Sequence, residues 1–173
     1  MGELEHQRAL EQLFAEHERS LFNVAYRYVW NAEDARDVVQ DAFVRLWRKR
    51  ERIDWPRAAG LAYSIVLGIA ANRRRGERLR RAITGWWGDD GDRVADSTAS
   101  PDHQLADAIR DRRARAAIDA LPERLRSVLV MSTFSGLDHA AIATILDVPV
   151  GTIGSRRHEA IARIKQVIEE EPR

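Results

Sequence analysis

Residues 121–157, LPERLRSVLVMSTFSGLDHAAIATILDVPVGTIGSRR, decide the fold. Pro122 suits the first turn of a helix, and Gly136 marks the point where that helix stops. Asp138 is a good N-cap for a short second helix, and after a tight turn a longer helix begins at about Gly151. A short helix, a tight turn and a longer helix are the outline of a helix-turn-helix.

The last of these helices has two distinct faces when its residues are placed at about 100° intervals. One face is predicted to be an apolar stripe that packs inward: Ile153, Ala160, Ile164, Val167 and Ile168. The opposite face carries Ser155, Glu159, Ala162 and Gln166, flanked by Arg156, His158 and Arg163. Short polar groups that reach base edges, with cations beside them for phosphates, suit insertion into a major groove. Periodicity alone leaves the alternative of an ordinary solvated face open.

Apolar residues recur at helical spacing through most of the chain, and no strand pattern of useful length interrupts them. Asn31 is a plausible N-cap for a helix that turns Val38, Val39, Ala42, Phe43, Leu46 and Trp47 inward. A further helix is expected over about 57–81, and helical spacing resumes at about residue 104. Between them, residues 84–101 are rich in glycine, serine and aspartate, which is typical of a flexible, acidic linker. The sequence therefore predicts an all-α chain with two small helical domains, residues 1–83 and 102–173.

The bulk composition excludes several classes of protein. The 173 residues contain no cysteine, which excludes disulfides, thiolate zinc sites and cysteine nucleophiles. The start of the chain does not have the pattern of a signal peptide, and no apolar stretch reaches the roughly 20 residues of a membrane span. The five histidines are not at metal-ligand spacing, and no phosphate loop or nucleophile elbow is present. We therefore expect a cytoplasmic protein without enzymatic activity, metal, cofactor or membrane insertion.

The net charge of +1 hides a strong segregation of charge along the chain. Basic residues concentrate between 72 and 82, and acidic residues concentrate between 88 and 107. A basic block of this kind indicates either a local nucleic-acid footprint or a solvated helix end. Trp86 and Trp87 lie in the linker, where they either cap the preceding helices or dock on a partner.

Residues 121–157 resemble region 4 of the extracytoplasmic-function (ECF) sigma factors, which belong to the sigma-70 family. The resemblance implies that the helix from Gly151 reads the minus-thirty-five promoter element and that its domain docks on the flap of the polymerase β subunit. The implied DNA contacts are Thr152, Ser155, Arg156, Arg157, His158, Glu159 and Arg163. Three positions depart from the family pattern. Asp147 stands where glycine is common, so its backbone is expected to be left-handed. Gly154 stands where a basic residue is frequent. Arg157 stands where a leucine is usual, so its side chain either snorkels outward or contacts the DNA backbone.

Residues 34–47, DARDVVQDAFVRLW, resemble the region 2 motif of the same family. Five polar side chains share one helix face, and the resemblance implies that they dock on the clamp helices of the polymerase β′ subunit: Asp34, Asp37, Gln40, Asp41 and Arg45. The alternative for this motif alone is the wet side of an amphipathic helix.

The segment that follows is implied to read and melt the minus-ten element. The residues that carry this role are Asp54, Trp55, Arg57, Tyr63, Asn72, Arg73 and Arg74. Trp55 is a candidate for stacking on an unpaired base, which is worth roughly 1–3 kcal/mol, or it plugs the core beside Pro56. Leu67 and Gly68 stand where family members often carry polar residues.

Two family motifs in the expected order predict a sigma factor that binds core RNA polymerase and promoter DNA and directs transcription initiation. The resemblance also implies an anti-sigma factor as a partner. The alternative is a stand-alone helix-turn-helix regulator, which would share the C-terminal domain but need its own dimer surface or effector pocket.

Overall fold

The computed structural model describes residues 2–84 and 112–170, and its elements are all helical. They are α1 (Glu3–Val29), α2 (Ala32–Arg48), two 3-10 turns (Arg50–Arg52 and Trp55–Arg57), α3 (Ala58–Thr84), α5 (Glu123–Phe134), α6 (His139–Leu146) and α7 (Val150–Glu170), and residues 112–120 are helical as well. No strand occurs in these residues, so the predicted all-α class is confirmed. The predicted linker from residue 85 on, with Trp86 and Trp87, lies outside the described residues.

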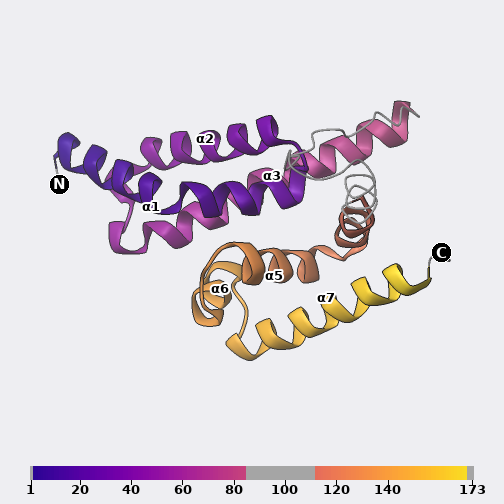
Figure 1. Cartoon of the computed structure of the whole chain (residues 1–173). Helices are drawn as coiled ribbons and strands as arrows, with labels where there is room; N and C mark the ends of the chain where they lie inside the picture. The colour runs from indigo at the N-terminus through magenta and orange to yellow at the C-terminus, as the bar shows by residue number, and fades with distance from the viewer. Residues whose placement is uncertain (1, 85–111, 171–173) are drawn as a thin grey trace, which may run out of the picture.

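Helices α1, α2 and α3 form one layer of the molecule (Figure 1). The predicted N-cap of α2 is confirmed, because the Asn31 side chain accepts a hydrogen bond from the Asp34 N–H at 2.9 Å. The apolar residues of α2 that pack into the layer are buried: Ala35, Val38, Val39, Ala42, Phe43 and Leu46. Trp47 was also predicted to face inward but is only partly buried.

Helix α1 is one continuous helix of 27 residues that ends in an unusual conformation. Its C-cap, Trp30, has φ 55° and ψ 20°, which is the left-handed region, although its side chain is only 8% exposed. A bulky aromatic residue is rare in that region, so the packing and hydrogen bonds around Trp30 must hold it there.

Helices α5, α6 and α7 form the second layer and contain the predicted helix-turn-helix. The Asp138 carboxylate caps α6 by accepting from the Ala141 N–H at 2.8 Å, as the sequence predicts. Asp147 closes α6 at φ 52°, and this left-handed conformation was also predicted. Gly136 has φ 73° at the end of α5, where glycine avoids the steric cost of a side chain.

The predicted apolar stripe of α7 is wrong at its C-terminal end. Ile153 and Ala160 are fully buried, but Val167 and Ile168 are 39% and 42% exposed. The reason is length, since α7 has 21 residues and the α5 helix that it packs against has 12, so the last turns of α7 extend past α5 (Figure 1).

The two layers share one hydrophobic core. Val128 and Met131 of α5 and Ile142 of α6 belong to the same buried cluster as Leu21 and Val24 of α1. The described residues therefore form one body, in which the N-terminal and C-terminal helices pack directly on each other.

Candidate polymerase and promoter interfaces

The polar ridge of α2 is largely accessible. Four of its five predicted residues are exposed: Asp37, Gln40, Asp41 and Arg45. Asp34 is partly buried, because the Arg73 guanidinium of α3 lies against it. Val44 is 42% exposed in the middle of this ridge, and the polar pattern used to find the site did not include it. An apolar contact among charged ones is the usual composition of a protein docking surface.

The predicted minus-ten residues at the end of α3 fall into two groups. Asn72 is exposed, but Arg73 and Arg74 form ion pairs with carboxylates of the same chain. Arg73 Nη1 lies 3.3 Å from Asp34 Oδ1, and its Nη2 lies 3.5 Å from Asp37 Oδ2. The Arg74 side chain is only 11% exposed, and its Nε donates to Asp119 Oδ1 at 3.1 Å.

Trp55 lines an open cavity of about 410 Å³ near the start of α1. The other lining residues are Glu3, His6, Arg50, Glu51 and Ile53. The His6 ring stacks on Trp55 with 5.8 Å between ring centroids, and the buried Trp55 Nε1–H has no hydrogen-bond partner within the described chain. His6 is distant in sequence from the predicted site, so the motif gave no signal for it. Asp54 and Arg57 flank the loop as an exposed ion pair at 3.6 Å.

Tyr63 is the predicted minus-ten residue that the structure places furthest from solvent. Its side chain is fully buried, and its hydroxyl donates to the Ser135 carbonyl at 3.1 Å. Ser20 Oγ lies 2.7 Å from the same hydroxyl. Burial raises the pKa of Tyr63, an effect that the Ser20 hydrogen bond partly offsets.

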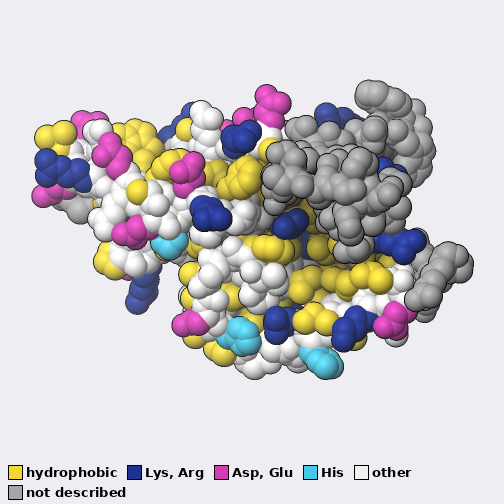
Figure 2. Space-filling model, in the orientation of Figure 1, with side chains coloured by type: hydrophobic (Ala, Val, Ile, Leu, Met, Phe, Trp, Pro, Cys, Tyr) yellow, Lys and Arg dark blue, Asp and Glu magenta, His cyan; other side chains and the backbone are white. Residues whose placement is uncertain are grey.

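Helix α7 presents the predicted minus-thirty-five residues on its outer side. Ser155, Arg157, His158 and Arg163 are exposed, and Thr152, Arg156 and Glu159 are partly buried. The exposure of Arg157 is compatible with both alternatives that the sequence left open for it, a side chain that snorkels outward and one that contacts the DNA backbone. The Glu159 carboxylate accepts from Arg163 at 2.9 Å and so orders one border of this face. Figure 2 shows cationic and histidine side chains along the edge that α6 and α7 form.

Arg126 is a buried residue that the site prediction did not include. Its side chain is 2% exposed and donates to the carbonyls of Ile118, Asp119 and Leu121 and to the Glu123 carboxylate. Desolvation by burial, reinforced by the nearby Arg74 cation, lowers the pKa of Arg126. The guanidinium thereby fixes the short connection between the helical residues 112–120 and α5.

No group of three or more histidine, aspartate or glutamate side chains within 2–84 and 112–170 could hold a metal ion. Among the helices of the same ranges, none is both long and apolar enough to cross a membrane.

Family models match both parts of the chain. The model "Sigma-70 region 2" matches residues 13–80, and the model "Sigma-70, region 4" matches residues 111–164.

Curated relatives extend over most of the chain. The chain is 30% identical over 141 residues to the ECF RNA polymerase sigma factor RpoE of Cereibacter sphaeroides, which covers 78% of this chain and 72% of that protein. It is 27% identical over 160 residues to the ECF RNA polymerase sigma factor SigE of Mycolicibacterium smegmatis. That alignment covers 91% of this chain but only 61% of the longer relative.

Among solved structures, the sigma factor RpoE from Bartonella quintana, crystallised with the anti-sigma factor NepR, matches with a TM-score of 0.61 and 19% identity. The match covers 98% of this chain and 97% of that one, and it shows a common fold.

Proposed function

This chain belongs to the ECF sigma factors of the sigma-70 family, and from that premise we propose that it acts as a promoter-directing subunit of bacterial RNA polymerase. It binds the core enzyme, recognises and melts promoter DNA and starts transcription, and it contributes no catalysis of its own. The observation that carries this proposal is one chain with both an exposed polar ridge on α2 and an outward-facing cationic helix in a helix-turn-helix. The proposed localisation is the cytoplasm, which contains the polymerase.

The functional modules follow the matched family models. We assign residues 1–83 to region 2, residues 84–101 to a linker and residues 102–173 to region 4. Region 2 binds the polymerase and the minus-ten element, and region 4 binds the minus-thirty-five element. Each module is a weak binder, and polymerase holds both at promoter spacing, so that the second contact forms without a second loss of translational freedom.

Polymerase docking uses the exposed ridge of α2. Asp37, Gln40, Asp41 and Arg45 supply charge and hydrogen bonds, and Val44 supplies an apolar contact at their centre. The partner is the clamp-helix surface of β′, and the flap of β takes the region 4 module. Complementary charge on such a surface increases the rate and the specificity of docking more than its final affinity.

Minus-thirty-five binding uses the N-terminal half of α7. Ser155 and His158 present hydrogen-bonding groups for base edges, while Arg156, Arg157 and Arg163 lie where phosphates would pass. Thr152 is at the start of the helix, where the backbone dipole also favours a phosphate.

Minus-ten binding uses the loop before α3 and the basic end of that helix. The Trp55 indole lines an open cavity, and we assign to it the stacking of an unstacked base. Asp54, Arg57 and Asn72 are exposed around this surface, and Tyr63, Arg73 and Arg74 reach it only if their internal contacts open.

An anti-sigma factor is the partner expected to keep the chain inactive. The support is the structural match to a sigma factor solved together with an anti-sigma factor. Such a partner would cover the α2 ridge, the minus-ten surface or both.

Run-off transcription tests the proposal. Core polymerase is supplied with a pool of promoter fragments from the source genome, with and without the purified chain. Transcripts that require the chain and are lost in an Asp41→Arg variant are the expected result. DNA binding by the chain without any transcript would instead support a stand-alone regulator.

A further inference from the structure

A set of polar contacts joins the first layer of the molecule to residues 119–123. The Trp30 Nε1–H donates to Asp119 Oδ1 at 3.2 Å, and Arg74 Nε donates to the same oxygen at 3.1 Å. Arg74 Nη2 also donates to the Asp119 carbonyl at 2.7 Å. Beside them, the Tyr28 hydroxyl donates to Glu123 Oε1 at 2.9 Å. We call these five residues the latch.

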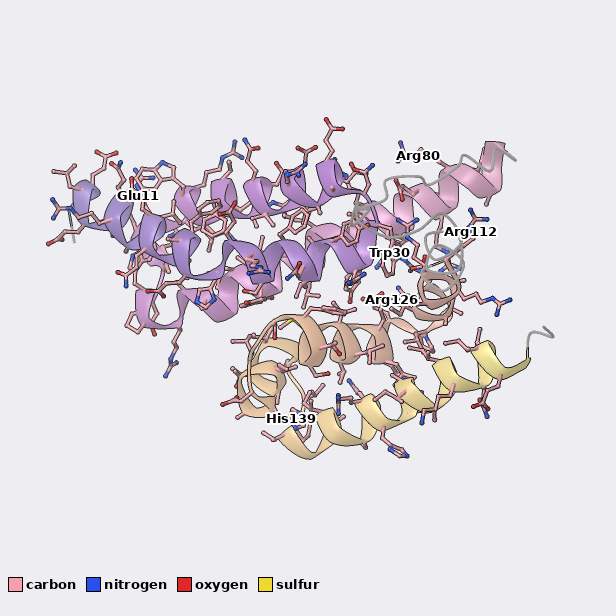
Figure 3. The ribbon with its side chains drawn as sticks, viewed as in Figure 1. Glu11, Trp30, Arg80, Arg112, Arg126 and His139 are labelled. Atoms are coloured by element: carbon pink, nitrogen blue, oxygen red, sulfur yellow. The ribbon has the colours of Figure 1, made fainter. Side chains whose placement is uncertain are left out.

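The latch lies at the end of α1, where the two layers face each other. Figure 3 shows Trp30 of the first layer and Arg126 of the second on opposite sides of this boundary. Arg126 donates to the Asp119 carbonyl and to the Glu123 carboxylate, so it holds both acidic latch residues in position. The Arg115 side chain donates to the Trp30 carbonyl and fixes the left-handed cap from the other side.

The latch includes Arg74, which the proposed function assigns to promoter DNA. The Asp119 carboxylate accepts from Arg74 Nε, as a DNA phosphate would, and the Asp119 backbone carbonyl accepts from Nη2 of the same guanidinium. Tyr63, further along the same boundary, donates to the Ser135 carbonyl of the second layer. While the layers are packed together, neither side chain is available to the minus-ten element.

The polymerase-docking ridge, unlike Arg74 and Tyr63, is accessible while the layers are packed together. Asp37, Gln40 and Asp41 are exposed in the same arrangement. The packed state therefore presents the surface for polymerase and hides part of the surface for DNA.

We infer that Asp119 and Glu123 act as an autoinhibitory latch that keeps the free chain closed and orders its two binding events, polymerase first and minus-ten DNA second. The inference rests on the proposed function. A closed state that binds polymerase but not DNA lowers the apparent DNA affinity by the fraction of molecules that are open. Docking of region 4 on a separate polymerase surface supplies the free energy that pulls the layers apart.

The first test removes the latch charge. Asp119→Ala is compared with Glu16→Ala, which removes an exposed carboxylate of α1 that accepts a hydrogen bond from Gln12 of the same helix. Binding of the isolated chain to a fluorescent minus-ten oligonucleotide should tighten by about three- to tenfold in Asp119→Ala, because two charge-assisted hydrogen bonds of the closed state are lost. The radius of gyration in solution should rise as well. Unchanged affinity and size, equal to those of Glu16→Ala, would overturn the inference.

The second test locks the layers together. The natural chain has no cysteine, so Gly60→Cys with Ile145→Cys introduces the only two thiols. A Cβ at Gly60 would lie 3.6 Å from Ile145 Cγ1, which brings the two sulfurs within bonding reach. The oxidised variant should still bind core polymerase but lose at least ten-fold in transcription, and reduction should restore it. Equal transcription by the oxidised and the reduced variant would overturn the latch inference. If neither the reduced variant nor the natural chain supports transcription, the result would contradict the proposed function instead.

Discussion

Arg73 Nη1 lies 3.3 Å from Asp34 Oδ1, and this contact joins the basic end of α3 to the acidic ridge of α2. Arg73 also donates to the Asp34 carbonyl at 3.0 Å and reaches Asp37 at 3.5 Å. The surface proposed for polymerase and the surface proposed for promoter DNA therefore share one guanidinium. Binding at either surface should change the charge that the other presents.

Replacing Arg73 by glutamine should move two affinities in opposite directions. Affinity for core polymerase should rise slightly, because Asp34 and Asp37 lose an internal partner worth roughly 0.2–1 kcal/mol, a factor of about 1.5 to 5. Affinity of the holoenzyme for minus-ten DNA should fall. Arg78→Gln, at an exposed position of the same helix, is the control and should lower DNA binding alone. A parallel fall in both affinities of Arg73→Gln would argue against shared charge.

Arg157 is exposed on α7 and is proposed to contact a phosphate. Arg157→Gln should weaken binding of minus-thirty-five duplexes of any sequence. The negative slope of log affinity against log salt should become shallower by about one. Lys165→Gln, two turns further along the helix, should leave the slope unchanged. Loss of sequence preference in Arg157→Gln, without a change in slope, would assign the residue to a base rather than to the backbone.

Asp147 closes α6 with φ 52°, a conformation that glycine adopts without steric cost. Asp147→Gly should raise the free energy of unfolding by up to about 1 kcal/mol, whereas Asp147→Ala should lower it, because a left-handed non-glycine residue costs roughly 1–2 kcal/mol. Urea denaturation of the two variants measures the difference. An Asp147→Gly chain no more stable than the natural chain would mean that the Asp147 side chain compensates for the strain.

Arg126 donates to the carbonyls of Ile118, Asp119 and Leu121. The Ile118 carbonyl also accepts from the Leu121 N–H, and the Asp119 carbonyl also accepts from Arg74. Arg126→Met should lower the free energy of unfolding by roughly 1–3 kcal/mol, because the buried Leu121 carbonyl loses the side-chain donor that the structure shows for it. Arg124→Met, at an exposed position two residues away, should change it by less than about 0.5 kcal/mol. Thermal denaturation compares them, and a stable Arg126→Met chain would show that water replaces the guanidinium.

Two of the three tyrosines make stability depend on high pH. Desolvation by burial, reinforced by the Glu123 carboxylate, raises the pKa of Tyr28 well above its ordinary value, and burial raises the pKa of Tyr63. Both bind their protons more tightly in the folded chain, so their contribution is complete below about pH 10 and is lost as pH rises through the folded pKa values. The urea midpoint should therefore fall above about pH 10, and less steeply in Tyr28→Phe. Identical pH slopes for both proteins would contradict the role of Tyr28.

Much of the local structure could be predicted from the sequence because its signals are local. Asn31 and Asp138 were identified as caps from their residue type and position, and the left-handed Asp147 followed from a family glycine at the same place. The polar ridge of α2 followed from helical spacing, and its exposure agrees with that pattern.

The internal partners of Arg73 and Arg74 could not be predicted in the same way. Their carboxylate partners, Asp34 and Asp119, are 39 and 45 residues away, and no short-range pattern connects such pairs. The basic run at the end of α3 therefore indicated either a nucleic-acid footprint or a solvated helix end, although two of its arginines are engaged within the molecule. The exposed end of α7 was missed for a related reason, since a helical wheel does not show where the neighbouring helix stops.

The length of α1 has a consequence for which changes in the chain can be tolerated. At about 1.5 Å per residue its 27 residues span roughly 40 Å, from His6 on Trp55 at one end to Tyr28 and Trp30 at the other. Each residue inserted or deleted in the middle of this helix would rotate one end by about 100° against the other. Tyr28 and Trp30 would then point away from Glu123 and Asp119 even if every side chain were retained. The length of helix α1 thus fixes the relative orientation of its two ends. Substitutions within the helix should be tolerated far more readily than insertions or deletions.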